Sequence, residues 1–146
     1  MSTLLERIPI FAGLQPEALR LLASRAQFSK AATGSPIVKE GEPGNRFFLI
    51  ESGDVRVVKG FGTPGEVELA RLGPLSSFGE MCILETLPRA ATVVAVTDTR
   101  LWSLESVSFL RLYEEQPKQY GLLLLNIARD LSRRLRNLDE RFSARQ

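Results

Sequence analysis

The sequence has 146 residues, of which 44% are hydrophobic and 25% charged, values typical of one soluble globular domain. Its formal net charge is only +2, and the one basic segment, residues 129–146, carries six arginines against three acidic residues, so we expect no direct nucleic-acid binding. Because the chain lacks histidine and has a single cysteine, Cys82, we expect neither a metal site nor an internal disulfide, and the lone thiol suits a reducing cytoplasm.

The N-terminal residues 1–27 are predicted to be helical. They begin with no basic segment ahead of a long apolar run, so we expect no signal peptide. One helix is predicted over residues 3–8 and a second over residues 15–26, where Pro16 suits the first helical position. Apolar side chains in the second segment recur at i, i+3 and i+4, which predicts that one face of this helix is buried.

Residues 28–105 have the pattern of a β domain. Short segments rich in β-branched and aromatic residues alternate with turn sequences such as GEPGN, SGD and FGTPG. Even spacing of this kind predicts a small antiparallel barrel or jelly roll. Alternation of apolar and polar residues in 55–60 and 67–72 also predicts strands with one buried face. The predicted strands lie within residues 36–40, 46–52, 54–60, 66–72, 91–96 and 99–104.

The chemistry of a binding-site lining is found in residues 78–95, which read FGEMCILETLPRAATVVA. Gly79 permits a tight backbone turn, a short helix is predicted in residues 80–84, and the Glu80 carboxylate can accept two hydrogen bonds. Arg89 offers a planar fork of donors to phosphate oxygens. One acid and one arginine suit a ribose with a singly charged phosphodiester, whereas a triphosphate would need a metal and more positive charge. These residues alone are equally consistent with a hairpin that is stabilised by a surface salt bridge and binds no ligand.

This segment resembles the phosphate-binding cassette of cyclic nucleotide-binding domains, which occur in the catabolite activator protein, protein kinase A regulatory subunits and cyclic nucleotide-gated channels. The shared pattern is an apolar residue, Gly-Glu, a small residue, a variable loop and then Arg-small-Ala. Residues 37–57 resemble the glycine-punctuated strands of this family, and residues 8–23 resemble the N-terminal helices of its bacterial members. The resemblance implies one domain over residues 1–146 of the α+β class, an antiparallel jelly roll (a double-stranded β-helix) in residues 28–105 with N-terminal helices in 1–27 and C-terminal helices in 106–146.

The resemblance also implies a role for each cassette residue. Glu80 would accept a hydrogen bond from the ribose 2′-OH, and Arg89 would pair with the cyclic phosphate. Backbone N–H groups around Gly79 and Ala90–Ala91 would complete the phosphate site. Ala90 stands where cGMP-selective relatives often carry threonine, which favours cAMP over cGMP. Cys82 stands where the family usually has alanine or glycine, and we interpret its side chain as packing. The implied ligand-binding set is Phe78, Gly79, Glu80, Met81, Cys82, Arg89, Ala90, Ala91 and Thr92, with no metal and no cofactor.

The C-terminal residues return to a helical pattern, with one helix predicted from Ser106 and a long helix after Pro117. The apolar run GLLLLNIA in the long helix is far shorter than the roughly 20 residues that span a bilayer, so we expect no membrane contact. A helix of about 25 residues is about 38 Å long and would extend past a small barrel, leaving an apolar seam for a homodimer. Packing of this seam on its own barrel is the alternative. The seam has Leu124, Leu131 and Leu138 at d, Ala128, Leu135 and Phe142 at a, and an interchain pairing of Arg134 at g with Asp139 at e.

The resemblance further implies that the final helix covers the purine, and the candidates for this contact are Arg129, Arg133, Arg136 and Asn137. We therefore expect a cyclic nucleotide sensor that rearranges its last helix on binding cAMP and signals to an unidentified effector protein. In related bacterial regulators a helix-turn-helix domain follows, whereas this sequence ends at Gln146. A stand-alone sensor, the sensor fragment of a Crp/Fnr-like transcription regulator and a ligand-free dimeric interaction module remain open. An enzyme is not expected, because metal ligands, histidine and a plausible nucleophile are missing.

Overall fold

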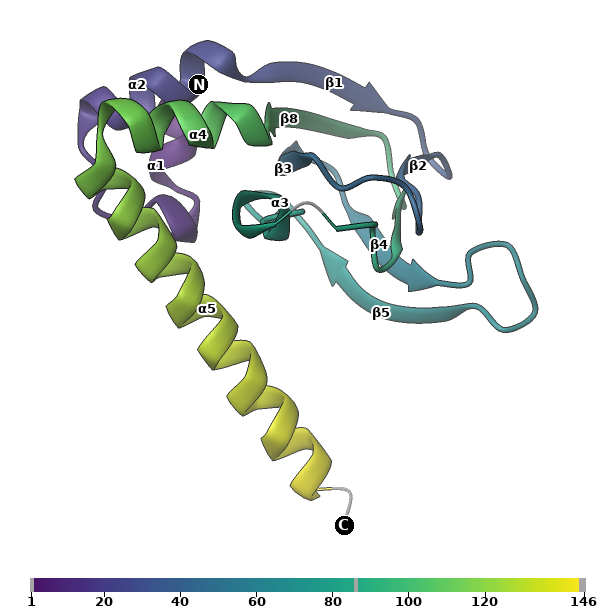
Figure 1. Cartoon of the computed structure of the whole chain (residues 1–146). Helices are drawn as coiled ribbons and strands as arrows, with labels where there is room; N and C mark the ends of the chain where they lie inside the picture. The colour runs from purple at the N-terminus through teal and green to yellow at the C-terminus, as the bar shows by residue number, and fades with distance from the viewer. Residues whose placement is uncertain (1, 86, 145–146) are drawn as a thin grey trace.

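The computed structural model of the protein describes residues 2–85 and 87–144, and the side chains within residues 3–85 and 87–140. Its strands form two four-stranded antiparallel sheets, with the strand orders β1-β8-β3-β6 and β2-β7-β4-β5. Helices gather at one end of this roll, and the last helix extends away from that end (Figure 1). The predicted α+β jelly roll with a long C-terminal helix is thus confirmed. The strands are β1 (Gln27–Ala31), β2 (Pro36–Val38), β3 (Arg46–Ser52), β4 (Val55–Lys59), β5 (Val67–Leu72), β6 (Ser77–Phe78), β7 (Thr92–Ala95) and β8 (Thr99–Glu105).

The helical layer packs on the outer face of the sheet that contains β3. Its core is centred on three aromatic rings: Phe47 of β3 meets Phe11 and Phe109 edge to face, with ring centroids 5.7 and 5.9 Å apart. Pro16 begins a helix because the first turn has no intrahelical partner for an N–H that proline lacks. The helices are α1 (Ser2–Glu6), the 3₁₀ helix η1 (Pro9–Phe11), α2 (Pro16–Arg25), α3 (Met81–Leu84), α4 (Ser106–Glu115) and α5 (Pro117–Ala144).

A second core lies between the two sheets of the roll. It forms because β3 pairs with β8 and β6 while β4 pairs with β7 and β5, so that inward-facing side chains of both sheets meet. Two of its rings, Phe48 and Phe78, stack with centroids 4.9 Å apart and planes 12° from parallel. The buried members of this core are Phe48, Ile50, Val55, Phe78, Val93 and Leu101.

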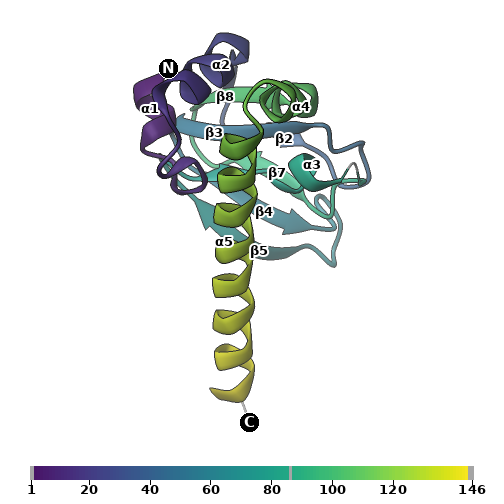
Figure 2. The ribbon, with the colours of Figure 1, turned by 60° about the vertical axis from the view of Figure 1, so that its left-hand side comes forward.

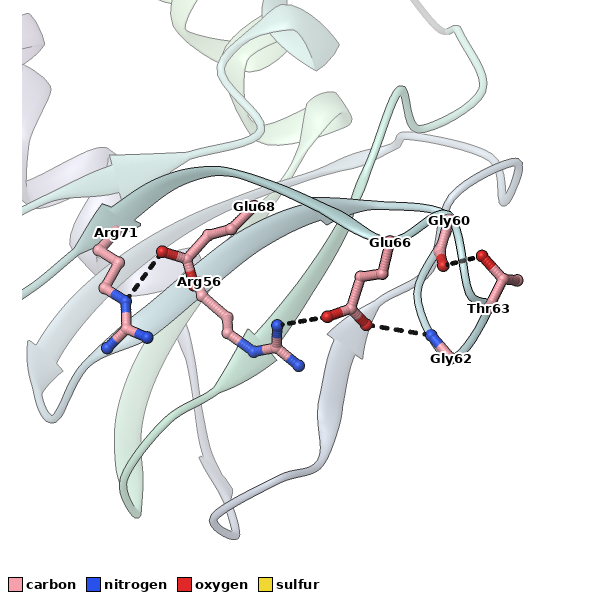
Figure 3. Close-up of polar contacts among 7 residues, drawn as sticks. All are labelled: Arg56, Gly60, Gly62, Thr63, Glu66, Glu68 and Arg71. Carbon is pink, nitrogen blue, oxygen red and sulfur yellow. Dashed lines mark hydrogen bonds and ion pairs between the residues drawn. The ribbon is translucent and has the colours of Figure 1, made fainter.

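β5 differs from its prediction. Its alternating pattern predicts one buried face, yet Val67 and Leu69 are 54% and 53% exposed. The reason is position, because β5 is an edge strand with only β4 beside it. The hairpin is held instead by polar contacts (Figure 3), in which Arg56 Nη1 pairs with Glu66 Oε2 at 2.9 Å. Glu66 Oε1 also accepts a hydrogen bond from the backbone N–H of Gly62 at 3.1 Å, which closes the loop between the strands.

α5 is one continuous helix of 28 residues, as its sequence predicts. Its first half packs on η1 and α4, and its C-terminal end extends past the edge of the roll, as the turned view in Figure 2 shows. Leu135 and Leu138 of the predicted seam are 63% and 60% exposed, and Phe142 lies outside the described side chains. Among the described residues, no helix is long and apolar enough to cross a bilayer.

Candidate ligand-binding site

A cavity of about 780 Å³ lies between the inner face of one sheet, residues 77–91 and the distal half of α5. Its floor is apolar and is made by strands β2, β4, β5 and β7, which contribute Val38, Val57, Ala70, Leu72 and Val93. Its polar side chains are Ser77, Glu80, Glu85, Arg89, Arg134 and Asn137. An apolar floor with a deep carboxylate and arginines beside it suits a ligand that combines a flat ring, a sugar and a negative charge.

Residue 79 has to be glycine for the site to form. Gly79 has a φ of +82°, a left-handed conformation that other residues adopt only with strain. A Cβ atom there would lie 2.6 Å from the Arg46 carbonyl oxygen and 2.7 Å from Arg89 Nη1. After this turn the chain enters the short helix α3, where the N–H of Cys82 donates to the Gly79 carbonyl at 3.2 Å. The predicted short helix after Gly79 is therefore confirmed.

Glu80 is the buried carboxylate of the cavity, with only 6% of the residue exposed. Its Oε1 accepts a hydrogen bond from Arg134 Nη1 at 2.8 Å, and this contact joins the cassette to α5. Arg134 Nη2 also lies 3.0 Å from Asp130 Oδ2, one turn earlier in the same helix. The carboxylate expected to receive ribose hydroxyls thus already has a cationic partner from the C-terminal helix.

Arg89 is half-buried and also lines the cavity. Its backbone is fixed by the loop before β3, because its N–H donates to the Glu42 carbonyl at 2.7 Å and its carbonyl accepts from Gly41 at 2.9 Å. Burial lowers the pKa of the guanidinium, and the neighbouring Cys82 and Glu42 partly oppose this shift. Among the described side chains, no carboxylate forms an ion pair with Arg89. Its charge is therefore available to an anion in the cavity.

The other predicted ligand-binding residues of segment 78–95 either line the cavity or pack beside it. Met81, Ala90 and Ala91 line the cavity together with Phe78, Gly79, Glu80, Cys82 and Arg89. Thr92 is buried in β7 outside the lining, where its Oγ1 accepts a hydrogen bond from the Glu40 N–H at 3.0 Å. Burial raises the pKa of the Cys82 thiol to about 11, with Arg89 opposing and Glu80 adding to the shift. The thiol is thus neutral near pH 7 and packs in the core, which fits the interpretation from sequence.

The structure separates the four candidates for the purine contact. Asn137 lines the cavity, whereas Arg129, Arg133 and Arg136 are exposed on α5 and do not line it. Sequence reasoning missed Arg134 and assigned it to an interchain pairing, but its side chain contacts Glu80 of the same chain. Leu138, assigned to the dimer seam, also lines the cavity. Arg134, Asn137 and Leu138 are spaced i, i+3 and i+4, so they lie on one face of α5. This spacing was the signal in the sequence that could have grouped them.

A family model described as "Cyclic nucleotide-binding domain" matches residues 29–116, more than half of the chain. The chain belongs to the cyclic nucleotide-binding domain family. This cyclic nucleotide-binding domain is 39% identical over 131 residues to the cyclic AMP receptor protein of Thermus thermophilus, covering 90% of this chain and 59% of that protein. It is 38% identical over 103 residues to the cAMP-dependent protein kinase regulatory subunit of Yarrowia lipolytica, covering 70% of this chain and 26% of that protein. The domain thus spans less than two thirds of the length of these relatives.

Solved structures share the fold of this chain. The catabolite activator protein of Thermus thermophilus has a TM-score of 0.77 at 38% identity, with 92% of this chain and 62% of that chain covered. The N-terminal domain of a transcriptional regulator from Streptomyces coelicolor has a TM-score of 0.80 at 28% identity, with 92% and 94% covered. A cyclic nucleotide-binding domain from Methylobacillus flagellatus has a TM-score of 0.81 at 27% identity, with 99% and 81% covered.

Proposed function

We propose that this domain is a cAMP sensor that reports ligand binding through α5. The observation that carries the proposal is that Glu80 and Arg89 face one cavity of about 780 Å³ with an apolar floor. In this arrangement the Glu80 carboxylate accepts the ribose 2′-OH, the Arg89 guanidinium pairs with the cyclic phosphate, and the purine lies toward the apolar strands. Among the described side chains that line the cavity, Arg89 is the cation without a carboxylate partner, and its one charge matches the single negative charge of a cyclic phosphodiester.

The choice of cAMP is supported by Ala90 and by the relatives. Ala90 lines the cavity and has no hydroxyl to donate to a guanine. Two similar proteins are named a cyclic AMP receptor protein and a cAMP-dependent protein kinase regulatory subunit. Asn137 and Leu138 of α5 line the same cavity and supply an amide and an apolar contact for the base.

The signal passes through the ion pair between Glu80 and Arg134. A ribose that hydrogen-bonds to Glu80 changes the partners of this buried carboxylate, and Arg134 then moves or contacts the ligand as well. Either change alters how the distal half of α5 is held to the roll, which is a population shift driven by differential affinity. The exposure of Leu135 and Leu138 supports an output at a homodimer interface formed by two copies of α5, with an effector protein as a further partner.

Calorimetry with protein stripped of co-purified ligand tests the proposal, using cAMP and cGMP as separate titrants at fixed salt. The expected result is a dissociation constant in the micromolar range or below, about −8 kcal/mol or better, with cAMP the tighter ligand. Arg89→Ala should weaken binding roughly 10- to 150-fold, the loss of one to two charge-assisted hydrogen bonds. Arg100→Ala, which removes an exposed arginine outside the cavity lining, is the matched control and should bind like the wild type.

Two outcomes would count against the proposal. A folded, ligand-free wild type that releases no heat with either nucleotide would leave the roll as a scaffold, and the ligand-free dimeric module would then be favoured. Hydrogen exchange along α5 that is the same with and without saturating cAMP would reject the signalling route while leaving binding intact.

A further inference from the structure

The backbone around Arg89 is built into a short ladder with the loop that precedes β3. In addition to the two hydrogen bonds at residue 89, the N–H of Gly44 donates to the Leu87 carbonyl at 3.0 Å. Pro43 and Pro88 face each other in an isolated antiparallel bridge. The segment that carries Arg89 is therefore held by the loop before β3, which lies outside residues 78–95. In the sequence, the glycines of that loop indicate only turns.

The Arg89 side chain runs through a narrow space between two glycines. A Cβ atom on Gly44 would lie 3.5 Å from both Cδ and Nε of Arg89, and one on Gly79 would lie 2.7 Å from its Nη1. Gly44 does not have a left-handed conformation, so close approach is its structural role, and its Cβ would also lie 2.7 Å from the Leu87 carbonyl oxygen. Both glycines thus leave room for the guanidinium.

The end of the side chain is held by neutral groups. Nη2 of Arg89 donates to the Arg46 carbonyl at 2.7 Å, and the guanidinium carbon lies 5.9 Å from the centroid of the Phe48 ring. Phe48 is itself fixed, because it is buried and stacks on Phe78. A carbonyl oxygen and the face of an aromatic ring attract a cation without neutralising its charge. A carboxylate in the same place would orient the arginine but would compete with an incoming phosphate.

We propose that Phe48 is a positioning residue for ligand binding, which acts by holding the guanidinium of Arg89 in a neutral cradle. The cradle consists of Gly44, the carbonyl of Arg46, the ring of Phe48 and Gly79. It directs an unneutralised guanidinium toward a singly charged phosphate. This inference rests on the proposed function, in which Arg89 is the phosphate ligand.

A double-mutant cycle separates positioning from packing. Phe48→Leu should weaken cAMP binding about fivefold, the effect of losing a partly desolvated cation–π contact, and should have no further effect in an Arg89→Ala background. Leu101→Val alters the same core cluster without contacting Arg89, so it should leave the affinity unchanged. Equal weakening by Phe48→Leu in both backgrounds, or no weakening in a folded protein, would overturn the proposal.

An isosteric replacement covers the case in which Phe48→Leu disturbs the fold. Incorporation of 3,4,5-trifluorophenylalanine at position 48 retains the ring and its packing but weakens the negative potential of its face. The expected result is a two- to fivefold loss of cAMP affinity with an unchanged melting temperature. Unchanged affinity of this protein would show that the ring acts by its shape alone.

A measurement on the ligand-free protein tests this proposal separately from the proposed function. In the ligand-free protein, the ring current of Phe48 should shift the Arg89 Nε–H resonance upfield, and the resonance is assigned by its loss in Arg89→Lys. Phe48→Leu should return it to the position of an exposed arginine. If the wild type binds no cyclic nucleotide but this shift is present, the proposed function fails and the cradle stands. If the resonance does not move in Phe48→Leu, the cradle is rejected.

Discussion

The two halves of α5 are held to the domain by different forces. In the first half, Leu123 and Ile127 are buried in the core that contains the N-terminal helices. Asn126 Nδ2 donates to the carbonyls of Ile10 at 3.0 Å and Ala12 at 2.9 Å. In the second half, the Glu80–Arg134 ion pair is the polar link to the roll among the described residues. One helix therefore has an anchored segment and a segment that a ligand can release.

The largest test of this difference is Leu123→Ala in the anchored half. It should lower the free energy of unfolding by about 2–5 kcal/mol, because a fully buried leucine leaves a cavity. Leu135→Ala, the matched change in the second half, should alter monomer stability by less than about 0.5 kcal/mol. Urea unfolding of both variants measures the contrast. Similar losses in the two variants would mean that the whole helix is anchored.

The core that anchors α5 also contains Cys82, and its thiol gives a pH-dependent test. Burial raises the pKa of Cys82 to about 11, so the unfolded thiol ionises first as pH rises. The buried, protonated thiol makes its full contribution to the free energy of unfolding below about pH 8.5, and this contribution is lost as pH rises toward 11. Between these values the wild type should lose up to about 3 kcal/mol more unfolding free energy than Cys82→Ala. Parallel pH profiles for the two proteins would show that the thiol is not buried in solution.

Asn126→Ala removes the two hydrogen bonds that fix α5 to η1 and the residue after it. Two backbone carbonyls lose their partner, and the expected loss of unfolding free energy is about 1–2 kcal/mol. Hydrogen exchange should rise in the first half of α5, since this is where the anchor acts. Asn137→Ala lies in the second half, lines the cavity and should leave stability unchanged, which makes it the control. An increase confined to the distal half would reverse the assignment of the anchor.

Among the variants that remove a contact between α5 and the rest of the domain, Arg134→Ala is expected to have the smallest effect on stability. Its side chain is 57% exposed, and Glu80 lines the cavity, where water can take the place of Arg134, so loss of the ion pair should cost only about 1 kcal/mol. Hydrogen exchange should nevertheless increase in residues 128–140 and stay unchanged in residues 117–127. The variant should also lose most of the ligand-dependent change in exchange along α5. A distal segment that remains equally protected in this variant would show that other contacts hold it.

Much of the fold could be predicted because its signals are local. Turn residues mark the ends of the strands, and Pro16 marks the start of a helix. The exceptions are β1 and β6, which carry little local signal: β1 has a mixed, exposed sequence, and β6 has only two residues. β5 shows the limit of alternation, because the pattern defines two faces but not whether another layer covers one of them.

The candidate site was predictable where its residues are close in the sequence. The cassette supplies Gly79, Glu80 and Arg89 within one segment, and all three line the cavity. The contribution of Phe48 was not predictable, because β3 lies far from residues 78–95 in the sequence. The spacing of Arg134, Asn137 and Leu138 indicates one face of α5, but no local pattern indicates that this face meets Glu80. Heptad spacing defines a stripe on α5, but the rotation of the helix decides whether Arg133 or Arg134 reaches Glu80.

The sequence by itself determined the class of fold and the segment 78–95 with its two charged residues, because these depend on local spacing and side-chain chemistry. The tertiary structure alone decided which groups surround those charges. It gives Glu80 a cationic partner from α5 and gives Arg89 a carbonyl and an aromatic ring. The physical reason is that a charge responds to groups within a few ångströms in space, and these come from distant parts of the chain only when the core packs.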